Sequence, residues 1–287
     1  MSYQYATIDI ETTGLNRYKD KVTWIGVGLA KEADSPLTKT LIYKGDDPDS
    51  IDKFVGLVRK LKKYKVKTVF QNGKFDTLFL EHHYDVKIPI SEDVMLMGTA
   101  FDLVAEHGLK KMAQAYLGVL DWDISKKEKL SGSEQTVVPY LKLDVKYTWE
   151  LFQYFRENMT PQQMKIYIKL LRPAYRTYRD IERNGLYLDL DAMKGVKKKY
   201  AKEEALLLKQ LKKHYDINWN SSAQVADVFF KKEGMPVIAK TGKGAPSTSA
   251  EVLRDLSMKG YELPKLLLQY KDVATRNKMF LNRCEEE

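Results

Sequence analysis

Acidic side chains stand in three separated segments of the chain. Asp9 and Glu11 flank an isoleucine at the end of an apolar stretch, and Asp76 follows the run Asn-Gly-Lys-Phe. In a strand, side chains two residues apart point to the same face, so Asp9 and Glu11 can reach one point in space. Tyr140 and Asp144 are four residues apart, which places the phenol and the carboxylate one turn apart on a helix face.

Carboxylates that come together from separate segments are typical ligands of hard divalent cations such as Mg²⁺ and Mn²⁺. The single cysteine, Cys284, has no partner within the chain, so a thiolate zinc site and an intrachain disulfide are excluded. Each motif alone has an ordinary alternative. Asp9 and Glu11 fit a solvated strand end, Asp76 fits a helix start that favours the dipole, and Tyr140 fits a core aromatic.

The segments around these acids predict the elements that must hold them. Apolar, β-branched and aromatic residues predict strands at 5–10, 22–30, 40–43 and 68–71, and helical spacing predicts helices at 50–63, 108–118 and 139–159. Pro139 is expected to begin the last of these helices, because the first N–H of a helix has no partner within it. Strands followed by helices indicate an α/β domain, and acids at its strand ends lie where such folds bind ligands.

A domain boundary is expected at Thr160-Pro161, which repeats the helix-start signal. The 287 residues, 44% of them hydrophobic, suffice for one large domain or two modest ones. Residues 1–160 have balanced charges, so the whole net charge of +9 lies in residues 161–287. We therefore expect domains at 1–160 and 161–287. The basic excess favours a polyanionic partner, although a solvated basic surface explains it equally well.

Targeting signals are missing from the sequence. No run of 18 apolar residues occurs, and the first residues lack the basic and apolar regions of a secretory signal. We expect a cytoplasmic protein, in a bacterium or a phage-infected cell, with no membrane partner.

Together, the three motifs resemble the 3′→5′ exonuclease family that has four acidic residues and a tyrosine. Asp9-Ile-Glu-Thr-Thr-Gly-Leu15 is similar to the first family motif, Gln71-Asn-Gly-Lys-Phe-Asp76 to the second, and Tyr140-Leu-Lys-Leu-Asp144 to the third. The resemblance covers residues 1 to about 160. It implies a ribonuclease H-like fold, two divalent ions (Mg²⁺ or Mn²⁺), and hydrolysis of DNA from a single-stranded or frayed 3′ end to give nucleoside 5′-monophosphates.

The same resemblance implies a role for each site residue. Asp9 would bridge both ions, and Glu11 and Asp144 would complete the coordination of the ion that binds the attacking water. Asp76 would act through coordinated water. Tyr140 would orient the attacking water, because a tyrosine with an ordinary pKa near ~10 is a poor base at neutral pH.

Three further residues are expected to contact the substrate, and two of them match family positions. Leu15 corresponds to an apolar wedge against the terminal bases, and Thr12 to a residue whose backbone contacts the terminal nucleotide. Asn72 is assigned to substrate binding, with an alternative in which it holds the turn before Asp76.

The region after residue 160 resembles the part of family A DNA polymerases that follows their exonuclease domain. The resemblance lies in the segments 181–189, 218–225 and 240–249, and the last helix, Leu263 to about Arg283, is similar to the start of the polymerase thumb. The palm aspartates and the fingers helix have no counterpart. We expect no polymerase activity from this chain alone and a separate polypeptide that carries palm and fingers; a truncated polymerase is the alternative.

Two other functions are compatible with the motifs. One is a 3′→5′ exoribonuclease related to ribonuclease D, which shares the tyrosine-type third motif; the polymerase-like second region argues against it. The other is a module that binds DNA or a polymerase without cleavage, which the complete set of ligands disfavours. The missing 5′-nuclease segment hints at a phage.

Overall fold

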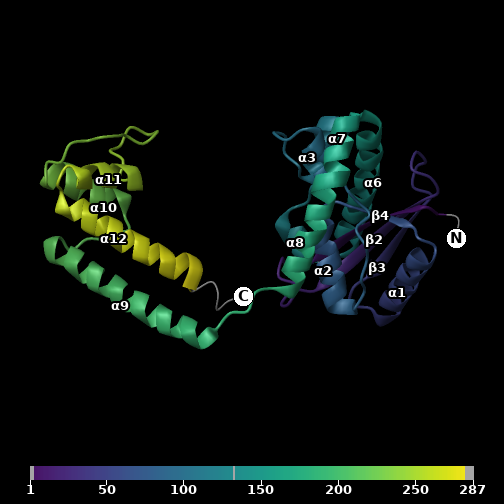
Figure 1. Cartoon of the computed structure of the whole chain (residues 1–287), viewed down its shortest axis with the longest axis horizontal. Coiled ribbons are helices and arrows are strands. Elements are labelled where there is room, and N and C mark those ends of the chain that lie inside the picture. The colour runs from purple at the N-terminus through teal and green to yellow at the C-terminus, as the bar shows by residue number, and fades with distance from the viewer. Residues whose placement is uncertain (1–2, 132, 282–287) are drawn as a thin grey trace. The chain divides into compact units, whose positions relative to one another are not determined.

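The computed structural model describes residues 3–131 and 133–281, which form two compact units that divide between Gly185 and Leu186 (Figure 1). The first unit contains a sheet and the helices up to α8, and the described part of the second unit contains helices and one isolated β-bridge between Lys240 and Pro246. The boundary expected at residue 160 stays a prediction. The compact first unit continues to Gly185 because two further helical segments pack against it.

A five-stranded mixed sheet forms the centre of the first unit, with the strand order β3-β2-β1-β4-β5. Its strands are β1 Tyr5–Thr12, β2 Val22–Ala30, β3 Lys39–Lys44, β4 Lys67–Phe70 and β5 Glu92–Asp93. β2 pairs antiparallel with β1 and β3, whereas β4 pairs parallel with β1 and β5. The expected α/β class is confirmed, and each predicted strand is present.

Helices cover both faces of the sheet, and the alternation along β1 separates the two faces. Ile8 and Ile10 are buried in the cluster that includes α1 (Pro48–Lys63) and α2 (Gly73–Tyr84). Tyr5 points the other way and packs on Trp149 of α6 (Glu134–Asn158), with ring centroids 5.5 Å apart. Odd-numbered β1 residues therefore face α6, and these include the two β1 acids.

The remaining helices before α6 are short: α3 Val94–Phe101, α4 Leu109–Met112, its π-helical continuation η1 Ala113–Leu117, and α5 Lys126–Ser131. Gly118 ends the helix predicted at 108–118, with φ of 66°. The prediction that Pro139 begins a helix is wrong, because α6 starts at Glu134 and contains Pro139. The proline removes one N–H donor, and α6 tolerates this loss because Val137 and Leu141 on either side are fully buried.

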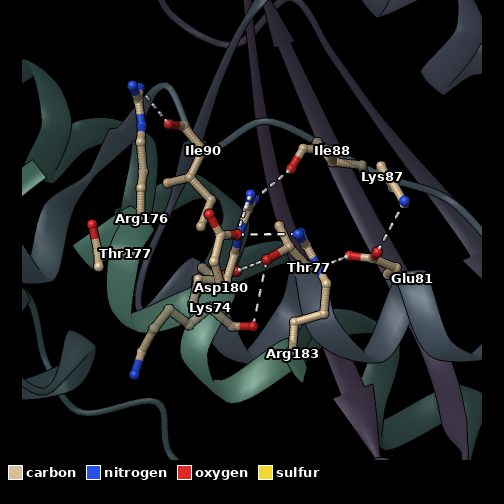
Figure 2. Close-up of polar contacts among 12 residues, drawn as sticks. Lys74, Thr77, Glu81, Lys87, Ile88, Ile90, Arg176, Thr177, Asp180 and Arg183 are labelled. Atoms are coloured by element: carbon tan, nitrogen blue, oxygen red, sulfur yellow. Dashed lines mark hydrogen bonds and ion pairs between the residues drawn. The ribbon is translucent and has the colours of Figure 1, made fainter. Parts of the chain in front are cut away.

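After α6 the chain forms α7 Pro161–Ile166, η2 Tyr167–Leu171 and α8 Arg172–Asn184. A capping box between Thr160 and Gln163 starts α7, as the sequence predicts. Figure 2 shows α8 beside α2, where Arg183 Nε donates to Glu81 Oε2 at 2.9 Å. These segments complete the first unit.

The second unit is helical, as expected, and has its own core. Its elements are α9 Leu190–His214, α10 Ser222–Ala226, η3 Asp227–Lys232, α11 Ala250–Met258, α12 Glu262–Arg276 and η4 Asn277–Leu281. Trp219, Phe229 and Leu267 are buried together at its centre. Residues 282 and 283 of the predicted last helix, and Cys284, lie outside the described residues. No described helix is both long and apolar enough to cross a membrane.

Candidate active site

The two acids of the first motif project from β1 towards α6. In the antiparallel register Asp9 lies opposite Gly26 and Glu11 opposite Trp24, so both carboxylates emerge on the face that α6 covers. Both side chains are partly buried. The strand context that the sequence predicts therefore holds, and it directs two negative charges to one side of the sheet.

Helix α6 brings Tyr140 and Asp144 to the same side, and glycines in β2 permit its close approach. A Cβ atom on Gly26 would lie 2.8 Å from one methyl carbon of Val145, and a Cβ atom on Gly28 would lie 2.7 Å from the other methyl carbon of Val145. Side chains at these two positions would push α6 outward. Tyr140 and Asp144 are both buried, with Asp144 in the turn that follows Tyr140.

Three of the four predicted ligands converge. Asp9, Glu11 and Asp144 each offer a carboxylate oxygen, and these oxygens lie within 4.8 Å of one another. Asp76 approaches the same strand from α2 and is 3% exposed. Its Oδ1 accepts a hydrogen bond of 3.0 Å from the backbone N–H of Ile10, the residue between the two β1 acids. Asp76 therefore borders the cluster of three.

A lysine that the sequence reasoning missed lies inside this cluster. Lys110 Nζ, from α4, donates to Oδ1 and Oδ2 of Asp144, each at 2.7 Å, and to the Tyr140 hydroxyl at 2.5 Å. Trp122 Nε1 donates to Asp144 Oδ1 at 2.7 Å. These contacts span 22 to 34 residues of sequence, and neither residue carries a periodic signal that could have revealed them.

Burial, together with neighbouring negative charges, raises the pKa values of Asp9, Glu11 and Asp76. Burial, followed by the charge of Asp144, raises the pKa of Glu11 to about 7. Burial and then the charges of Asp144, Asp76 and Glu11 raise the pKa of Asp9 well above its ordinary value, although Lys110 opposes the shift. Burial also raises the pKa of Asp76, against the hydrogen bond from Ile10 N–H. The cluster therefore favours any cation that relieves this repulsion.

The donor set fits a hard divalent ion. All three converging side chains offer carboxylate oxygen, the ligand type that Mg²⁺ and Mn²⁺ prefer. The pKa values of Asp9 and Glu11 are raised because their negative charges are desolvated and unbalanced. A bound divalent cation would balance these charges. The arrangement of these residues is thus a candidate metal site.

The predicted substrate contacts lie at the end of β1, in the turn that follows it and directly before α2. Leu15 is 86% exposed in the turn after β1, which leaves its side chain free to meet a ligand. Thr12 Oγ1 donates to the Gly14 carbonyl at 2.6 Å, within the same turn. Asn72 precedes α2 with φ of 58°, and its Oδ1 accepts from the Tyr175 hydroxyl at 3.0 Å. The last contact agrees with the alternative in which Asn72 holds the turn before Asp76.

Comparison with known families decides the class of this site. A sequence model described as 3′-5′ exonuclease matches residues 2–160, which is more than half of the chain and includes all four acids and Tyr140. The chain belongs to the 3′-5′ exonuclease family. Residues 190–286 of the chain match a second model, DNA polymerase family A. The resemblance to both families that the motifs predict is confirmed.

Curated relatives of the exonuclease are longer polymerases. It is 27% identical to DNA polymerase I of Pseudomonas aeruginosa over 97% of its own length and 32% of that protein. It is 22% identical to the DNA polymerase of Bacillus phage SP01, over 92% of its own length and 37% of that protein. The chain thus spans about a third of the relatives it matches. The separate palm-and-fingers polypeptide, the absence of polymerase activity and the cytoplasmic location stay predictions.

Solved structures support the fold of the exonuclease. The polymerase domain of Pol1 from M. smegmatis, in complex with DNA primer-template and dNTP, superposes with a TM-score of 0.71 over 96% of this chain and 45% of its own, at 16% identity. Brucella melitensis NrnC gives 0.50 over 64% of this chain and 87% of its own, at 18% identity. With the family match, these likenesses confirm the expected ribonuclease H-like fold.

Proposed function

We propose that this exonuclease is a metal-dependent 3′→5′ DNA exonuclease, and the proofreading part of a family A DNA polymerase, which releases nucleoside 5′-monophosphates. The observation that carries the proposal is the convergence of Asp9, Glu11 and Asp144, with carboxylate oxygens within 4.8 Å, inside the region matched to the family. In the reaction, a water oxygen bonds to the terminal phosphorus. The bond from phosphorus to the 3′ oxygen breaks, and that oxygen takes a proton.

Asp9, Glu11 and Asp144 would hold two ions, Mg²⁺ or Mn²⁺, with Asp76 acting through water. The ions, when bound, neutralise phosphoryl charge and make a water molecule more acidic. Asp76 borders the other three acids, and its Oδ1 accepts a hydrogen bond from the Ile10 N–H. That bond orients the Asp76 carboxylate beside the two β1 acids.

Tyr140 serves to position water rather than to remove its proton. Burial, and then the nearby Asp144 and Glu11 charges, raise the pKa of the phenol, so it is neutral at any physiological pH. A neutral phenol both donates and accepts one hydrogen bond, which suits a residue that orients the attacking water. Thr12 ends β1 and Leu15 lies in the turn that follows, where they would contact the terminal nucleotide.

The test is digestion of a 5′-labelled single-stranded DNA oligonucleotide and an RNA of the same sequence, with Mg²⁺, Mn²⁺ or EDTA. We expect a ladder of products shortened from the 3′ end of the DNA in either metal and none in EDTA. Asp144→Ala should lower the cleavage rate by about 10³-fold, because it removes a ligand of the metal ions. Those ions stabilise the charge of the transition state by several kcal/mol. Asp52→Ala, at an exposed acid on α1, is the matched control and should cleave like the wild type.

Circular single-stranded DNA, which has no end, should survive. Cleavage restricted to RNA would replace the proposal with an exoribonuclease. Metal-dependent DNA binding without cleavage would replace it with a binding module. Full activity of Asp144→Ala would overturn the metal assignment.

A further inference from the structure

The first turn of α2, which carries Asp76, is capped by residues from elsewhere in the chain. The first N–H groups of a helix need partners outside it, and the side chain of the preceding residue usually supplies one. Asn72 stands in that place but makes no such bond. Instead the Gly73 N–H donates to Asp93 Oδ2 at 2.8 Å, and the Lys74 N–H donates to the Tyr175 hydroxyl at 3.0 Å.

The Tyr175 hydroxyl bridges two parts of this turn. It accepts from the Lys74 N–H and donates to Asn72 Oδ1, both at 3.0 Å, so one oxygen joins the residue before α2 to the first turn of the helix. The side chain is 6% exposed, which leaves little water to replace the hydroxyl. Removal of the hydroxyl would leave a partly buried donor, the Lys74 N–H, and a partly buried acceptor, Asn72 Oδ1, without this partner.

Helix α8, which carries Tyr175, is fastened along α2 and the segment that follows it. Arg176 Nη2 donates to the Ile90 carbonyl at 3.0 Å, and Arg183 Nε donates to Glu81 Oε2 at 2.9 Å (Figure 2). Arg172 also pairs with Glu92 at 3.1 Å. Residues 161–189, which include α8, lie between the two family matches and belong to neither.

The position of Asp76 depends on this capped turn. Asp76 is three residues after Gly73, within the first turn of α2. Its bond to the Ile10 N–H requires that this turn lie against β1 at a fixed distance. A shift of the turn by a fraction of an ångström therefore moves the carboxylate relative to Asp9 and Glu11.

We propose that Tyr175 is a positioning residue of the nuclease site. Its hydroxyl, which comes from α8, caps α2 and thereby holds Asp76 beside the carboxylates of Asp9, Glu11 and Asp144. The proposal rests on the proposed function for its catalytic consequence. It makes α8, a helix outside both family matches, a working part of the exonuclease. Tyr175 touches neither substrate nor ion and acts through the first turn of α2.

The experiment compares Tyr175→Phe with Tyr84→Phe in the full chain. Tyr84 lies at the other end of α2, and its hydroxyl donates to the Gly45 carbonyl at 2.9 Å, so both variants lose one partly buried hydroxyl on or against the same helix. For Tyr175→Phe we expect kcat on single-stranded DNA to fall roughly tenfold, with KM for DNA unchanged. The Mg²⁺ concentration for half-maximal rate should rise several-fold. Tyr84→Phe should retain both values.

Hydrogen exchange of the backbone gives a readout that does not depend on activity. In Tyr175→Phe, amides of residues 72–77 should exchange faster than in the wild type, whereas in Tyr84→Phe they should not. Unchanged exchange in this segment, or equal kinetic losses in the two variants, would overturn the proposal. A wild-type chain that cleaves nothing would refute the proposed function, and the exchange measurement alone would then decide the role of Tyr175.

Discussion

Lys110 occupies the place at Asp144 that a divalent ion would need. Its ammonium bonds to both carboxylate oxygens at 2.7 Å, in a location where Asp144 is 4% exposed. When a buried carboxylate is paired with a cation, loss of the cation costs more than the pair itself stabilises. The lysine therefore offsets negative charge in the ion-free chain, and an ion that binds Asp144 must displace it.

Replacement of Lys110 by methionine should separate the stabilisation of the ion-free chain by Lys110 from its competition with a bound ion. Methionine keeps the aliphatic volume but carries no charge. In EDTA the variant should lose about 3 kcal/mol of unfolding free energy, because Asp144 stays buried without its ammonium partner. Mg²⁺ should stabilise the variant more than the wild type, because no ammonium has to leave. Urea unfolding in EDTA and in Mg²⁺ measures both. Lys111→Met, at the exposed neighbouring lysine, is the control; equal responses of the two variants would contradict this role.

The raised pKa of Glu11 makes stability depend on pH in a defined direction. Its pKa is about 7 in the folded chain against an ordinary 4.5, so between these values the folded chain binds a proton that the unfolded chain lacks. This contribution to ion-free stability is complete below about pH 4.5 and is lost as pH rises through about 7. A divalent ion requires ionised Glu11, so stabilisation by Mg²⁺ should grow across the same window.

Melting temperatures measured at about pH 5.5 and about pH 8, with and without Mg²⁺, check this expectation. The shift caused by Mg²⁺ should be larger at the higher pH. In Glu11→Gln, the Mg²⁺-induced shift in melting temperature should differ less between the two pH values than in the wild type. An equal shift at both pH values in the wild type would show that Glu11 does not control ion binding.

At the scale of elements, strand β2 sets how closely α6 approaches the acids of β1. A Cβ on Gly26 would meet Val145 at 2.8 Å and Leu141 at 3.0 Å, both on α6. Strand β2 therefore has to lack a side chain at position 26, where it faces α6. Tyr140 and Asp144 reach the cluster because of that absence.

Gly26→Val should push α6 away from the sheet. We expect a loss of about 1–3 kcal/mol in unfolding free energy from overpacking. Displacement of Asp144 should also lower the cleavage rate by about 10²-fold, the effect typical of a misplacement near 1 Å. Gly56→Ala in α1 is the control, because its Cβ would meet no atom within 4 Å. That change should keep activity and raise stability by up to about 1 kcal/mol. Wild-type cleavage by Gly26→Val would show that α6 adjusts without moving the site.

The sequence predicts the elements that carry the four acids, because short-range periodicity determines them. The strand from Tyr5 and the helix around Asp144 follow from residues close in sequence. Lys110 and Tyr175 could not be predicted in this way, because their partners lie 34 and 101 residues away and their own neighbours carry no signal of the contact. The helix start predicted at Pro139 was wrong, because tertiary packing of α6 outweighs the loss of the proline N–H donor.

At the scale of the whole molecule, compact units and family matches divide the chain differently. The exonuclease match ends at residue 160, whereas the compact unit ends at Gly185. Tyr167 and Tyr175, in the intervening segment, are buried in two different core clusters of the first unit. The segment is therefore part of the folding unit, whatever domain the sequence assigns to it.

A fragment of residues 1–185 should fold and cleave DNA at a rate within a few-fold of the full chain on short single strands. A fragment of residues 1–160 should lose cooperative unfolding, because it exposes the surfaces that α7 and α8 cover and leaves the Lys74 N–H at the start of α2 without the Tyr175 hydroxyl. Circular dichroism during heating and the cleavage assay measure both fragments. Full activity of the shorter fragment would place α8 outside the functional unit.

The cap on α2 also imposes an order in time. Tyr175 follows Lys74 by 101 residues, so a growing chain has made Asp76 long before it has made the hydroxyl that holds its turn. At ~5–20 residues per second, synthesis of the intervening segment takes about 5–20 s. During that interval the sheet and α1 can form, while the start of α2 lacks its partner. The nuclease site is thus expected to mature late, only after α8 has left the ribosome.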